Sequence, residues 1–454
     1  MRVLCGLTLA LTLGASTPTA HEPVQESDPR VELPDLDRKA ARELGRLVED
    51  WFDARPATRF DAWDPEARAA LVERARALGP LPHVDPEHLA ETLFESARDG
   101  AGKFKPKRGR LDLETPWGEA WGHLVDGGPD GLVIGLHGGG EGVGDAGEAR
   151  SNWTVPGLTG LYPQAIRLYG DAWNTAQGER FVLTLIDQAK LHLGVDPDRV
   201  YVMGFSMGGT GSWHLAGRYP DLLAGAIPAH GVIMAAPRAQ LATPEEVQAL
   251  QHGLLPNVRN LPVYWYTGTD DMNCRPGTFL YADQRLALLR EQDPTGYGRL
   301  RFQLHDGLAH AFPPGEPKAG IDWVLAQERD AFPETVVWEY AANPFPIPRE
   351  QDPQGRLEQR WFYWLSCDEP VDMMRVRAER KGATITLDVR GAMPSDFTIW
   401  LNDTMVPRGT EVTVLDRRGQ ELYRGTPEPT YENLLESFDA RVDRTLLFDR
   451  RIDL

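Results

Sequence analysis

A single serine stands between two glycines where a short apolar run of the chain ends. Residues 200–204 are rich in β-branched and aromatic side chains, and the sequence Gly204-Phe205-Ser206-Met207-Gly208 closes that run. Glycine on either side permits a sharp strand-to-helix turn, because a larger side chain there would crowd the backbone. Such a turn lifts the serine hydroxyl clear of a sheet. Ser206 is therefore a candidate nucleophile.

The serine needs partners further along the chain. A serine hydroxyl is a weak nucleophile at neutral pH, so a base must take its proton and a carboxylate must orient that base. In doubly wound hydrolases the order is serine, acid and histidine, each at the carboxyl end of a strand. Here the apolar run 262–266 leads into Asp270 and Asp271, and later His305 and His310 follow another such run. The residues therefore follow the order serine, acid and histidine. Their spacing leaves open whether Asp270 or Asp271 is the acid and whether His305 or His310 is the base.

Alternating strand-like and helix-like segments position these residues. Apolar and polar residues alternate around Pro116-Trp117-Gly118, which predicts a hairpin at the start of the unit. Strands that alternate with helices imply a parallel sheet covered on both faces. We therefore predict an α/β fold with a doubly wound, mostly parallel sheet. The predicted segments are the hairpin at 108–126, strands at 131–136, 200–204, 262–267 and 300–305, and helices at 179–193 and 321–328.

The regions on either side of this unit have a different pattern. Between residues 35 and 101 apolar residues recur at helical spacing, which predicts a helical N-terminal region. We expect it to pack on the outside of the main unit, and capping of a substrate cleft is the alternative. After Phe332, short strand-like runs separated by turns predict a small all-β sandwich. The predicted boundaries are a signal peptide at 1–20, the helical region at 21–107, a catalytic domain at 108–332 and a β domain at 333–454.

One aromatic run in the C-terminal region, Trp361-Phe362-Tyr363-Trp364, has two interpretations. Exposed on a surface, it would form a platform on which sugars stack. In a strand, however, its members alternate between the two faces, so at least half of them belong to a core. We favour core packing.

Taken together, these motifs resemble the α/β-hydrolase superfamily. Asp196-Pro197-Asp198-Arg199-Val200-Tyr201 and the serine motif after it are similar to the secreted polyhydroxybutyrate depolymerase-like and feruloyl-esterase-like group, with prolyl oligopeptidase-type hydrolases nearby. The resemblance covers residues 108–332. The acid of that group lies three residues after a glycine, which implies Asp271, with Asp270 as the alternative. Its histidine has a glycine three residues before it, which implies His310 and leaves His305 as a strand residue.

The resemblance extends to the end of strand 131–136. The sequence His137-Gly138-Gly139-Gly140 resembles the HGGG loop of esterases, and His137 is expected to hold that loop. Two backbone N–H groups must point at the oxyanion that forms when a serine attacks a carbonyl, and glycines let the main chain come close. Met207 N–H is one expected donor. Gly138 or Gly139 supplies the other.

Three further residues near these segments have a functional and a structural interpretation. Trp173 and Trp213 are candidates for lining an acyl pocket, although core packing explains both equally well. His230 follows Pro228 closely, and we expect it to be structural and not catalytic.

The N-terminus predicts the location of the protein, and the net charge limits its partners. After Met1-Arg2, an apolar run to Leu13 and small residues up to Ala20 are typical of a secretory signal, which predicts a secreted or periplasmic protein. No other apolar stretch is long enough to span a membrane. The net charge of −19 is spread along 454 residues, which disfavours nucleic acid as a partner.

Motifs for cofactors and metals are missing from the sequence. HExxH, CxxC and Walker-type GK[ST] do not occur, and residues 142–147 match a dinucleotide fingerprint without following a strand directly. We expect no cofactor and no metal. Of three cysteines, Cys5 lies in the predicted signal, so Cys274 and Cys367 either form one disulfide or remain two structural thiols.

These features predict a secreted serine hydrolase that cleaves carboxylic esters through an acyl-enzyme. Only residues 231–261 are available as a lid, so we expect an open cleft and a bulky or polymeric ester substrate. A prolyl oligopeptidase-type serine peptidase is the first alternative, although the first hundred residues show no propeller-like repeats. A non-catalytic binding protein on a hydrolase scaffold is the second. The sequence leaves the oligomeric state open.

Overall fold

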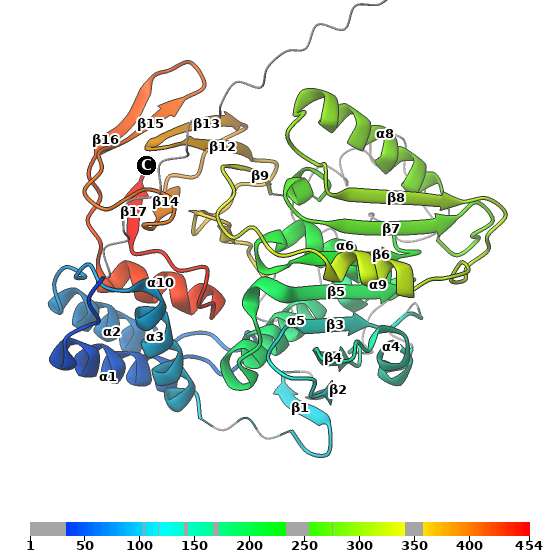
Figure 1. Cartoon of the computed structure of the whole chain (residues 1–454), viewed down its shortest axis with the longest axis horizontal. Coiled ribbons are helices and arrows are strands. Elements are labelled where there is room, and N and C mark those ends of the chain that lie inside the picture. The colour runs from blue at the N-terminus through cyan, green and yellow to red at the C-terminus, as the bar shows by residue number, and fades with distance from the viewer. Residues whose placement is uncertain are drawn as a thin grey trace, which may run out of the picture.

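The structure is a computed structural model that describes most of the chain after the N-terminus. The described residues are 33–102, 104, 106–116, 118–139, 144–166, 172–232, 254–274, 276–340 and 357–454. The predicted signal peptide lies outside them, and so do residues 233–253 of the predicted lid. Figure 1 shows three regions, which are a large sheet with its helices, a group of N-terminal helices and a C-terminal β region.

An eight-stranded sheet forms the centre of the main unit. Its order is β1-β2-β4-β3-β5-β6-β7-β8, antiparallel from β1 to β4 and parallel from β4 to β8. This is the predicted doubly wound, mostly parallel sheet of an α/β-hydrolase fold. The strands are β1 (Arg110–Thr115), β2 (Gly118–Val125), β3 (Leu132–Leu136), β4 (Thr159–Pro163), β5 (Val200–Phe205), β6 (Gly225–Ala229), β7 (Val263–Gly268) and β8 (Leu300–His305).

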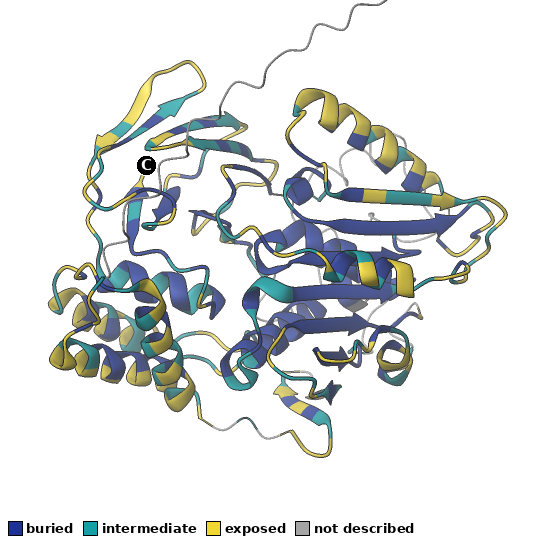
Figure 2. Cartoon of the chain, in the orientation of Figure 1, coloured by how far each residue is buried: buried dark blue, intermediate teal, exposed yellow. Residues whose placement is uncertain are grey.

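Helices cover both faces of this sheet. Successive side chains of a strand point to opposite faces, so Leu132 and Ile134 join one buried cluster and Val133 joins the other. Helices α5, α6 and α8 contribute to the first cluster, and α4 and α9 contribute to the second. The central strands are accordingly buried, whereas α8 has an exposed outer face (Figure 2). The helices are α4 (Ala146–Trp153), α5 (Ala176–Gln188), α6 (Met207–Arg218), α8 (Gly277–Gln292) and α9 (Lys318–Leu325), with short turns η1 (Ala172–Asn174), η2 (Ala189–Leu193), η3 (Pro197–Arg199), η4 (Pro220–Leu222) and η5 (Pro256–Arg259).

The strands and helices predicted for this unit are all present, with shifts of a few residues at their ends. The helix predicted at 179–193 is α-helical only to Gln188, continues as the π-helical turn η2, and ends at Gly194 in the left-handed conformation. Strands β4 and β6 were not predicted. Both contain glycine and proline within five residues, which hides the strand pattern.

Two sheets packed face to face form the C-terminal region. Side chains from both sheets, such as Trp338 and Ile399, lie in one buried cluster, which is the predicted sandwich. Helix α10 (Tyr431–Arg441) is an addition that the sequence pattern did not predict. The first sheet holds β16 (Glu421–Gly425), β15 (Val412–Asp416), β13 (Thr384–Arg390), β12 (Arg375–Lys381) and β9 (Thr335–Glu339), and the second holds β10 (Trp361–Phe362), β11 (Leu365–Ser366), β14 (Thr398–Leu401) and β17 (Arg450–Asp453).

The aromatic run at residues 361–364 is a hairpin and not the single strand that was predicted. β10 and β11 pair in antiparallel fashion, and Tyr363 in the turn between them has φ 53°. The ring of Trp361 lies 4.6 Å from that of Trp400 and 4.7 Å from the guanidinium of Arg441. The other three aromatic side chains of the run are buried. Contacts within the protein occupy the run, which supports core packing over a sugar platform.

The N-terminal helices α1 (Arg38–Ala54), α2 (Pro65–Ala77) and α3 (Pro86–Gly100) pack in an unexpected place. Their buried side chains share a cluster with α10 and with Leu191 of the main unit, so they lie mainly on the C-terminal region. In Figure 1 the carboxyl ends of β5, β7 and β8 point to the right, whereas α1 to α3 lie at the left. They also contact the outside of the main unit, where Arg55 after α1 donates to Asp187 of α5. The expectation that they pack on the outside of the main unit is therefore right in part, and they do not cap the carboxyl ends of these strands.

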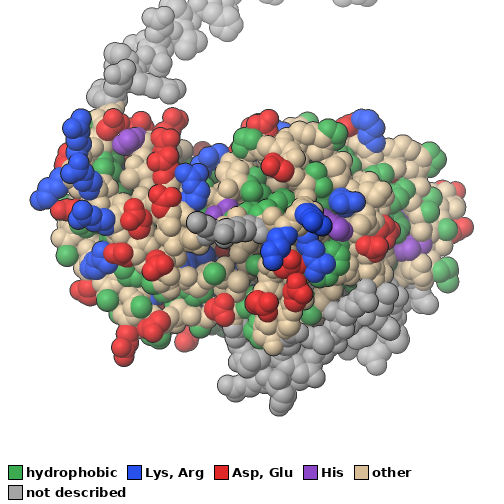
Figure 3. Space-filling view, turned by 90° about the horizontal axis from the view of Figure 1, so that it is seen from below, with side chains coloured by type: hydrophobic (Ala, Val, Ile, Leu, Met, Phe, Trp, Pro, Cys, Tyr) green, Lys and Arg blue, Asp and Glu red, His purple; other side chains and the backbone are tan. Residues whose placement is uncertain are grey.

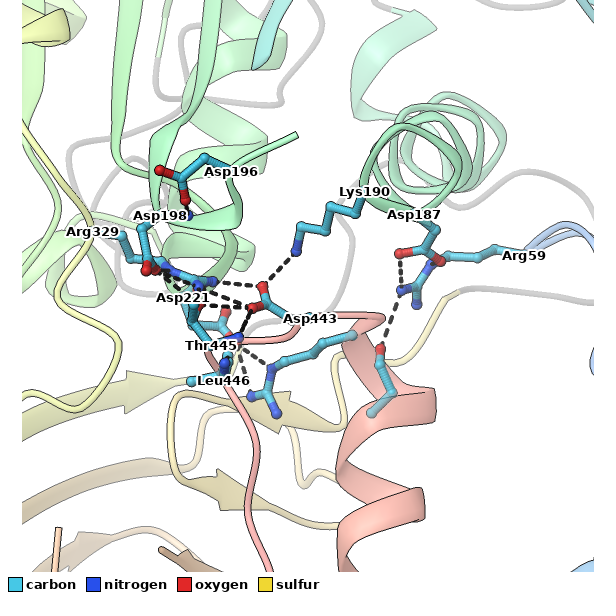
Figure 4. A network of polar contacts seen from close by, with 12 residues as sticks. Arg59, Asp187, Lys190, Asp196, Asp198, Asp221, Arg329, Asp443, Thr445 and Leu446 are labelled. Carbon is cyan, nitrogen blue, oxygen red and sulfur yellow. Dashed lines mark hydrogen bonds and ion pairs between the residues drawn. The ribbon is translucent and has the colours of Figure 1, made fainter. Parts of the chain in front are cut away.

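A buried polar network joins the main unit to the C-terminal region (Figure 4). Asp443, which follows α10, accepts hydrogen bonds from Lys190 at 2.6 Å and from Arg329 at 2.8 Å. Arg329 also donates to Asp198 at 2.7 Å, and Asp198 lies just before β5. Asp443, Lys190 and Arg329 are all buried. The network thus lies toward the amino end of β5.

Three smaller predictions concern cysteines, membrane spans and charge. Cys274 and Cys367 are both buried, and no disulfide joins them. Among the described helices, none has the length and apolar character needed to cross a bilayer. Acidic and basic side chains are interspersed on the face shown in Figure 3.

Candidate active site

Ser206 occupies a strained turn between β5 and α6. Its φ is 57° and its ψ is −120°, a conformation that L-residues rarely adopt, and the Ser206 N–H donates to Ala229 O at 2.9 Å. The flanking positions have no room for a side chain, so both must be glycine. A Cβ on Gly204 would lie 2.2 Å from Gly208 O, and one on Gly208 would lie 2.1 Å from Leu136 O. The local sequence therefore imposes the turn that places the serine between strand and helix.

Asp271 and His310 meet beside this turn. Asp271 follows β7 and His310 follows β8, and His310 Nδ1 lies 2.8 Å from Asp271 Oδ2. The other carboxylate oxygen accepts the N–H groups of Asn273 at 2.9 Å and Cys274 at 2.8 Å. Asp271 is buried and His310 is half-buried. The carboxylate is therefore fixed from both sides, and one of its oxygens faces the histidine.

The structure separates the paired candidates that the sequence left open. Asp270 is exposed, and its carboxylate accepts a hydrogen bond from Thr269 Oγ1 at 3.2 Å. His305 is the last residue of β8, with its ring 6.2 Å from that of Tyr266. Only Asp271 and His310 contact each other.

A second histidine contacts the same carboxylate oxygen. We expected His230 to be structural and did not predict its contact with Asp271. His230 Nδ1 lies 2.7 Å from Asp271 Oδ2. His230 directly follows β6, so it stands at the carboxyl end of a parallel strand like the other site residues. That position was the available signal, but β6 itself was not recognised because Pro228 interrupts its short apolar run.

Hydrogen bonding sets the charge of Asp271. Burial by itself would raise the pKa of this carboxyl, but hydrogen bonds from His230 and His310 outweigh burial and hold the pKa well below its ordinary value. Asp271 is therefore a carboxylate at neutral pH, and the Nδ1 of each histidine carries the proton that it donates.

The same three side chains have a spacing that a metal ion can use. One ligand atom from each of His230, Asp271 and His310 lies within 4.8 Å of the others. The Nδ1-to-Oδ2 distances of 2.7 and 2.8 Å are those of direct charge-assisted hydrogen bonds. Protons on the two imidazoles account for this arrangement.

The ring of Phe205 packs over the histidines. Its centroid lies 4.8 Å from that of His310, 5.1 Å from that of His230 and 4.7 Å from that of Phe312. Within the described residues, no hydrogen bond joins Ser206 Oγ to His310. Hydrogen bonds of this kind are often long in an unliganded site and shorten when substrate binds.

The loop after β3 lies beside Ser206, and the ring of His137 holds it. His137 Nε2 accepts the N–H of Ala165 at 3.0 Å, so its proton is on Nδ1, which donates to Gly138 O at 2.8 Å. In a trans peptide the carbonyl and the following N–H point in opposite directions, so the N–H of Gly139 points away from the His137 ring. A Cβ on Gly138 would lie 3.5 Å from Ser206 Cβ, which places the loop beside the serine.

Met207 is the first residue of α6, directly after the serine. The first N–H groups of a helix have no acceptor within the helix, and the helix dipole favours negative charge there. The N–H of Met207 is therefore suited to an anion near Ser206.

Trp173 and Trp213 belong to the core. Both rings are buried. Trp173 Nε1 donates to His137 O at 3.1 Å, so Trp173 holds the loop at the carbonyl of His137. Trp213 packs edge-to-face on Trp265 with centroids 5.0 Å apart. Of the two interpretations for this pair, the structure favours core packing over lining of a pocket.

Two cavities lie elsewhere in the molecule. Volumes of about 400 and 890 Å³ lie where the N-terminal helices meet the C-terminal region, and Trp63 and Trp361 line both. Neither is lined by Ser206, Asp271 or His310.

Comparisons with known proteins relate part of the chain to hydrolases. Residues 160–339, less than half of the chain, match the Dienelactone hydrolase family, and the comparison with curated proteins found no match. Three solved structures show similarity at low identity. They are a thermostable esterase (20% identity, TM-score 0.36, covering 48% of this chain and 62% of that chain), acetyl xylan esterase from Aspergillus awamori (17%, 0.35, 47% and 98%) and SOBER1 from Arabidopsis thaliana (19%, 0.31, 43% and 97%). The match therefore spans less than two thirds of the thermostable esterase.

Proposed function

We propose that this protein is a secreted serine hydrolase that cleaves carboxylic esters. The observation that carries the proposal is the 2.8 Å hydrogen bond between Asp271 and His310 beside the strained turn of Ser206. The three residues follow β5, β7 and β8 in the order serine, acid and histidine. The match of residues 160–339 to a family named for the hydrolysis of a lactone, which is a cyclic ester, adds support.

The proposed acylation step uses each residue in one role. Ser206 Oγ attacks the carbonyl carbon of the ester while His310 Nε2 takes the hydroxyl proton. Asp271 holds the ring in the tautomer that leaves Nε2 free and stabilises the imidazolium that forms. The tetrahedral intermediate then expels the alcohol, which receives the proton from His310, and an acyl group remains on Ser206.

Deacylation repeats the sequence with water. His310 removes a proton from water, the resulting hydroxide attacks the acyl carbon, and Ser206 leaves with the proton from His310. In both steps the N–H groups of Met207 and Gly139 are the proposed donors to the oxyanion, with Gly138 N–H as the alternative to Gly139.

The substrate is proposed to be a bulky or polymeric ester. Two sequence-based predictions motivate this part of the proposal, namely export and a short lid that leaves the cleft open. The helices at residues 38–100 support an esterase over a prolyl oligopeptidase-type peptidase, since helices and not propeller blades precede the main unit. We expect no cofactor for this chemistry.

The test is hydrolysis of p-nitrophenyl esters from acetate to decanoate by the wild type and by Ser206→Ala. Turnover that Ser206→Ala abolishes supports the esterase, and its dependence on chain length measures the acyl pocket. Turnover of prolyl amides in the absence of ester turnover would favour the peptidase. If the wild type neither turns over esters or amides nor reacts with a fluorophosphonate, the scaffold is a binding protein and the proposal is wrong.

A further inference from the structure

Two imidazoles share one oxygen of Asp271. His310 Nδ1 and His230 Nδ1 approach the same Oδ2 at 2.8 and 2.7 Å, and the two rings are nearly perpendicular with centroids 5.3 Å apart. The proposed mechanism needs only one of these bonds. The second histidine therefore calls for a physical account.

His230 is held firmly in its place. It is fully buried, its φ is 49°, and its N–H donates to Tyr266 O at 2.9 Å. Its ring packs against those of Phe205 and Tyr266 at 5.1 and 5.7 Å. Within the described chain its Nε2 has no hydrogen-bond partner, so the bond to Asp271 is the one hydrogen bond of this side chain.

This position is costly unless the bond to Asp271 serves a purpose. A buried polar atom without a partner loses its hydrogen bonds to water without replacement, and a non-glycine residue in the left-handed region adds strain. A simple apolar side chain would fill the same space among aromatic rings without the unpaired nitrogen.

We propose that His230 is a positioning residue that divides the hydrogen-bonding capacity of Asp271 and so limits how strongly Asp271 stabilises the imidazolium that His310 forms. The inference rests on the proposed function and goes beyond it. A carboxylate oxygen that already accepts one charge-assisted hydrogen bond has less negative charge to offer a second donor. The imidazolium form of His310 is then less stabilised by Asp271 than it would be if His310 were the single donor to that oxygen.

Few ionisable groups surround His230. Asp271 contacts it after β7, and His310 contacts its ring after β8. From β7 itself, Tyr266 packs on it as a phenol, because burial raises the pKa of Tyr266. His305 of β8 lies against Tyr266, with centroids 6.2 Å apart. From β5 the neighbour is the uncharged ring of Phe205. Asp271 is thus the ionised group that His230 acts on.

The test compares two substitutions. His230→Phe keeps an aromatic ring but has no donor, whereas the amide nitrogen of His230→Asn can occupy the place of Nδ1, and asparagine tolerates positive φ. In His230→Phe the midpoint of the acidic limb of kcat/KM against pH should rise by about 0.5–1 pH unit. His230→Asn should restore the wild-type midpoint.

A merely structural role predicts a different pattern. Both variants would then lose kcat/KM by a similar factor at every pH, and the midpoint would not move. That result, or a midpoint in His230→Phe equal to that of the wild type, overturns the inference.

Proton NMR provides a readout that needs neither activity nor a folded His230→Phe. The wild type should show two low-field N–H resonances from imidazoles bonded to Asp271, and His310→Ala should retain one of them. Loss of both in folded His310→Ala would disprove the His230 bond. If the wild type hydrolyses no ester but shows both resonances, the proposed function fails while the hydrogen bond stands.

Discussion

At the scale of single residues, contact and not sequence position distinguishes a functional side chain from its neighbour. Asp270 and Asp271 are adjacent at the end of β7, yet one is exposed and the other is buried between two histidines and two backbone N–H groups. Asp270 lies in the turn that follows β7 and Asp271 stands where this turn ends, so the two adjacent carboxylates have different surroundings.

This difference gives a matched pair of substitutions. Asp271→Asn removes the negative charge that orients His310 and stabilises its imidazolium, so kcat should fall by about 10³- to 10⁴-fold on p-nitrophenyl esters. Asp270→Asn changes an exposed neighbour of identical type and should keep kcat within about twofold of the wild type. Equal losses in the two variants would contradict the assignment of Asp271.

We expect His137 to act on the proposed reaction through the backbone. His137→Ala removes the ring that holds the carbonyl of Gly138, so the N–H of Gly139 is no longer oriented, and kcat should fall by about 10- to 100-fold with little change in KM. Steady-state kinetics measures this split. The control is His83→Ala, which changes an exposed histidine in the N-terminal region. A rise in KM at constant kcat would show that the loop binds substrate instead.

At the scale of elements, tight backbone contacts fix the turn that carries Ser206. β3, β5 and the start of α6 approach so closely that side chains at Gly204 and Gly208 would overlap with backbone atoms. The unpredicted β6 belongs to the same assembly, since Ala229 O accepts the N–H of Ser206. Pro228 has no N–H and stands between Ala226, whose N–H donates to Pro262 O, and His230, whose N–H donates to Tyr266 O. It therefore interrupts the hydrogen bonds between β6 and β7 at one position.

Substitution of a glycine in the turn tests this packing. Gly208→Ala places a Cβ 2.1 Å from Leu136 O, so the turn must move, and both stability and activity should fall, with about 1–3 kcal/mol lost in urea unfolding. Gly277→Ala is the control, because a Cβ there meets nothing within 4 Å at the first residue of α8. If Gly208→Ala has wild-type stability and activity, space does not require this glycine.

At the scale of the whole molecule, the C-terminal region lies far from Ser206. Its contacts with the main unit involve residues before the strands of the sheet. For example, Thr445 donates to Asp198 before β5, and Arg259 before β7 donates to Thr335 O. The N-terminal helices lie against the C-terminal region at that same side (Figure 1). The reacting residues stand at the opposite ends of these strands, so we expect the C-terminal region to affect stability more than chemistry.

The network at this junction predicts a large change in stability. Asp443→Asn leaves Arg329 and Lys190 buried without their shared carboxylate, which should cost about 3–5 kcal/mol in urea unfolding at neutral pH. Asp322→Asn, which breaks the exposed pair with Lys318, should change stability little. A small effect of Asp443→Asn would show that the junction adapts to the missing charge.

The same network sets the sign of a pH dependence. Burial alone would raise the pKa of Asp443, but the charges of Arg329 and Lys190 outweigh burial and hold the pKa well below its ordinary value. A carboxyl with a lowered folded-state pKa contributes stability above its unfolded-state value of about 3.9 and loses that contribution as the pH falls below it. As the pH is lowered below about 3.9, the free energy of unfolding of the wild type should therefore decline more steeply than that of Asp443→Asn.

The sequence by itself determined the main sheet except for β4 and β6, the serine turn, and the candidates for acid and base. Glycine spacing and apolar periodicity are local patterns, and they specify turns, strands and helices through contacts between residues close together in the chain. The tertiary structure decided what depends on contacts between distant segments. It selected Asp271 and His310 within their pairs, brought His230 onto the same carboxylate, and placed the N-terminal helices on α10. Glycine spacing already implied Asp271 and His310. Their contact, the bond from His230 and the position of the N-terminal helices depend on which strand ends and which faces become neighbours after folding.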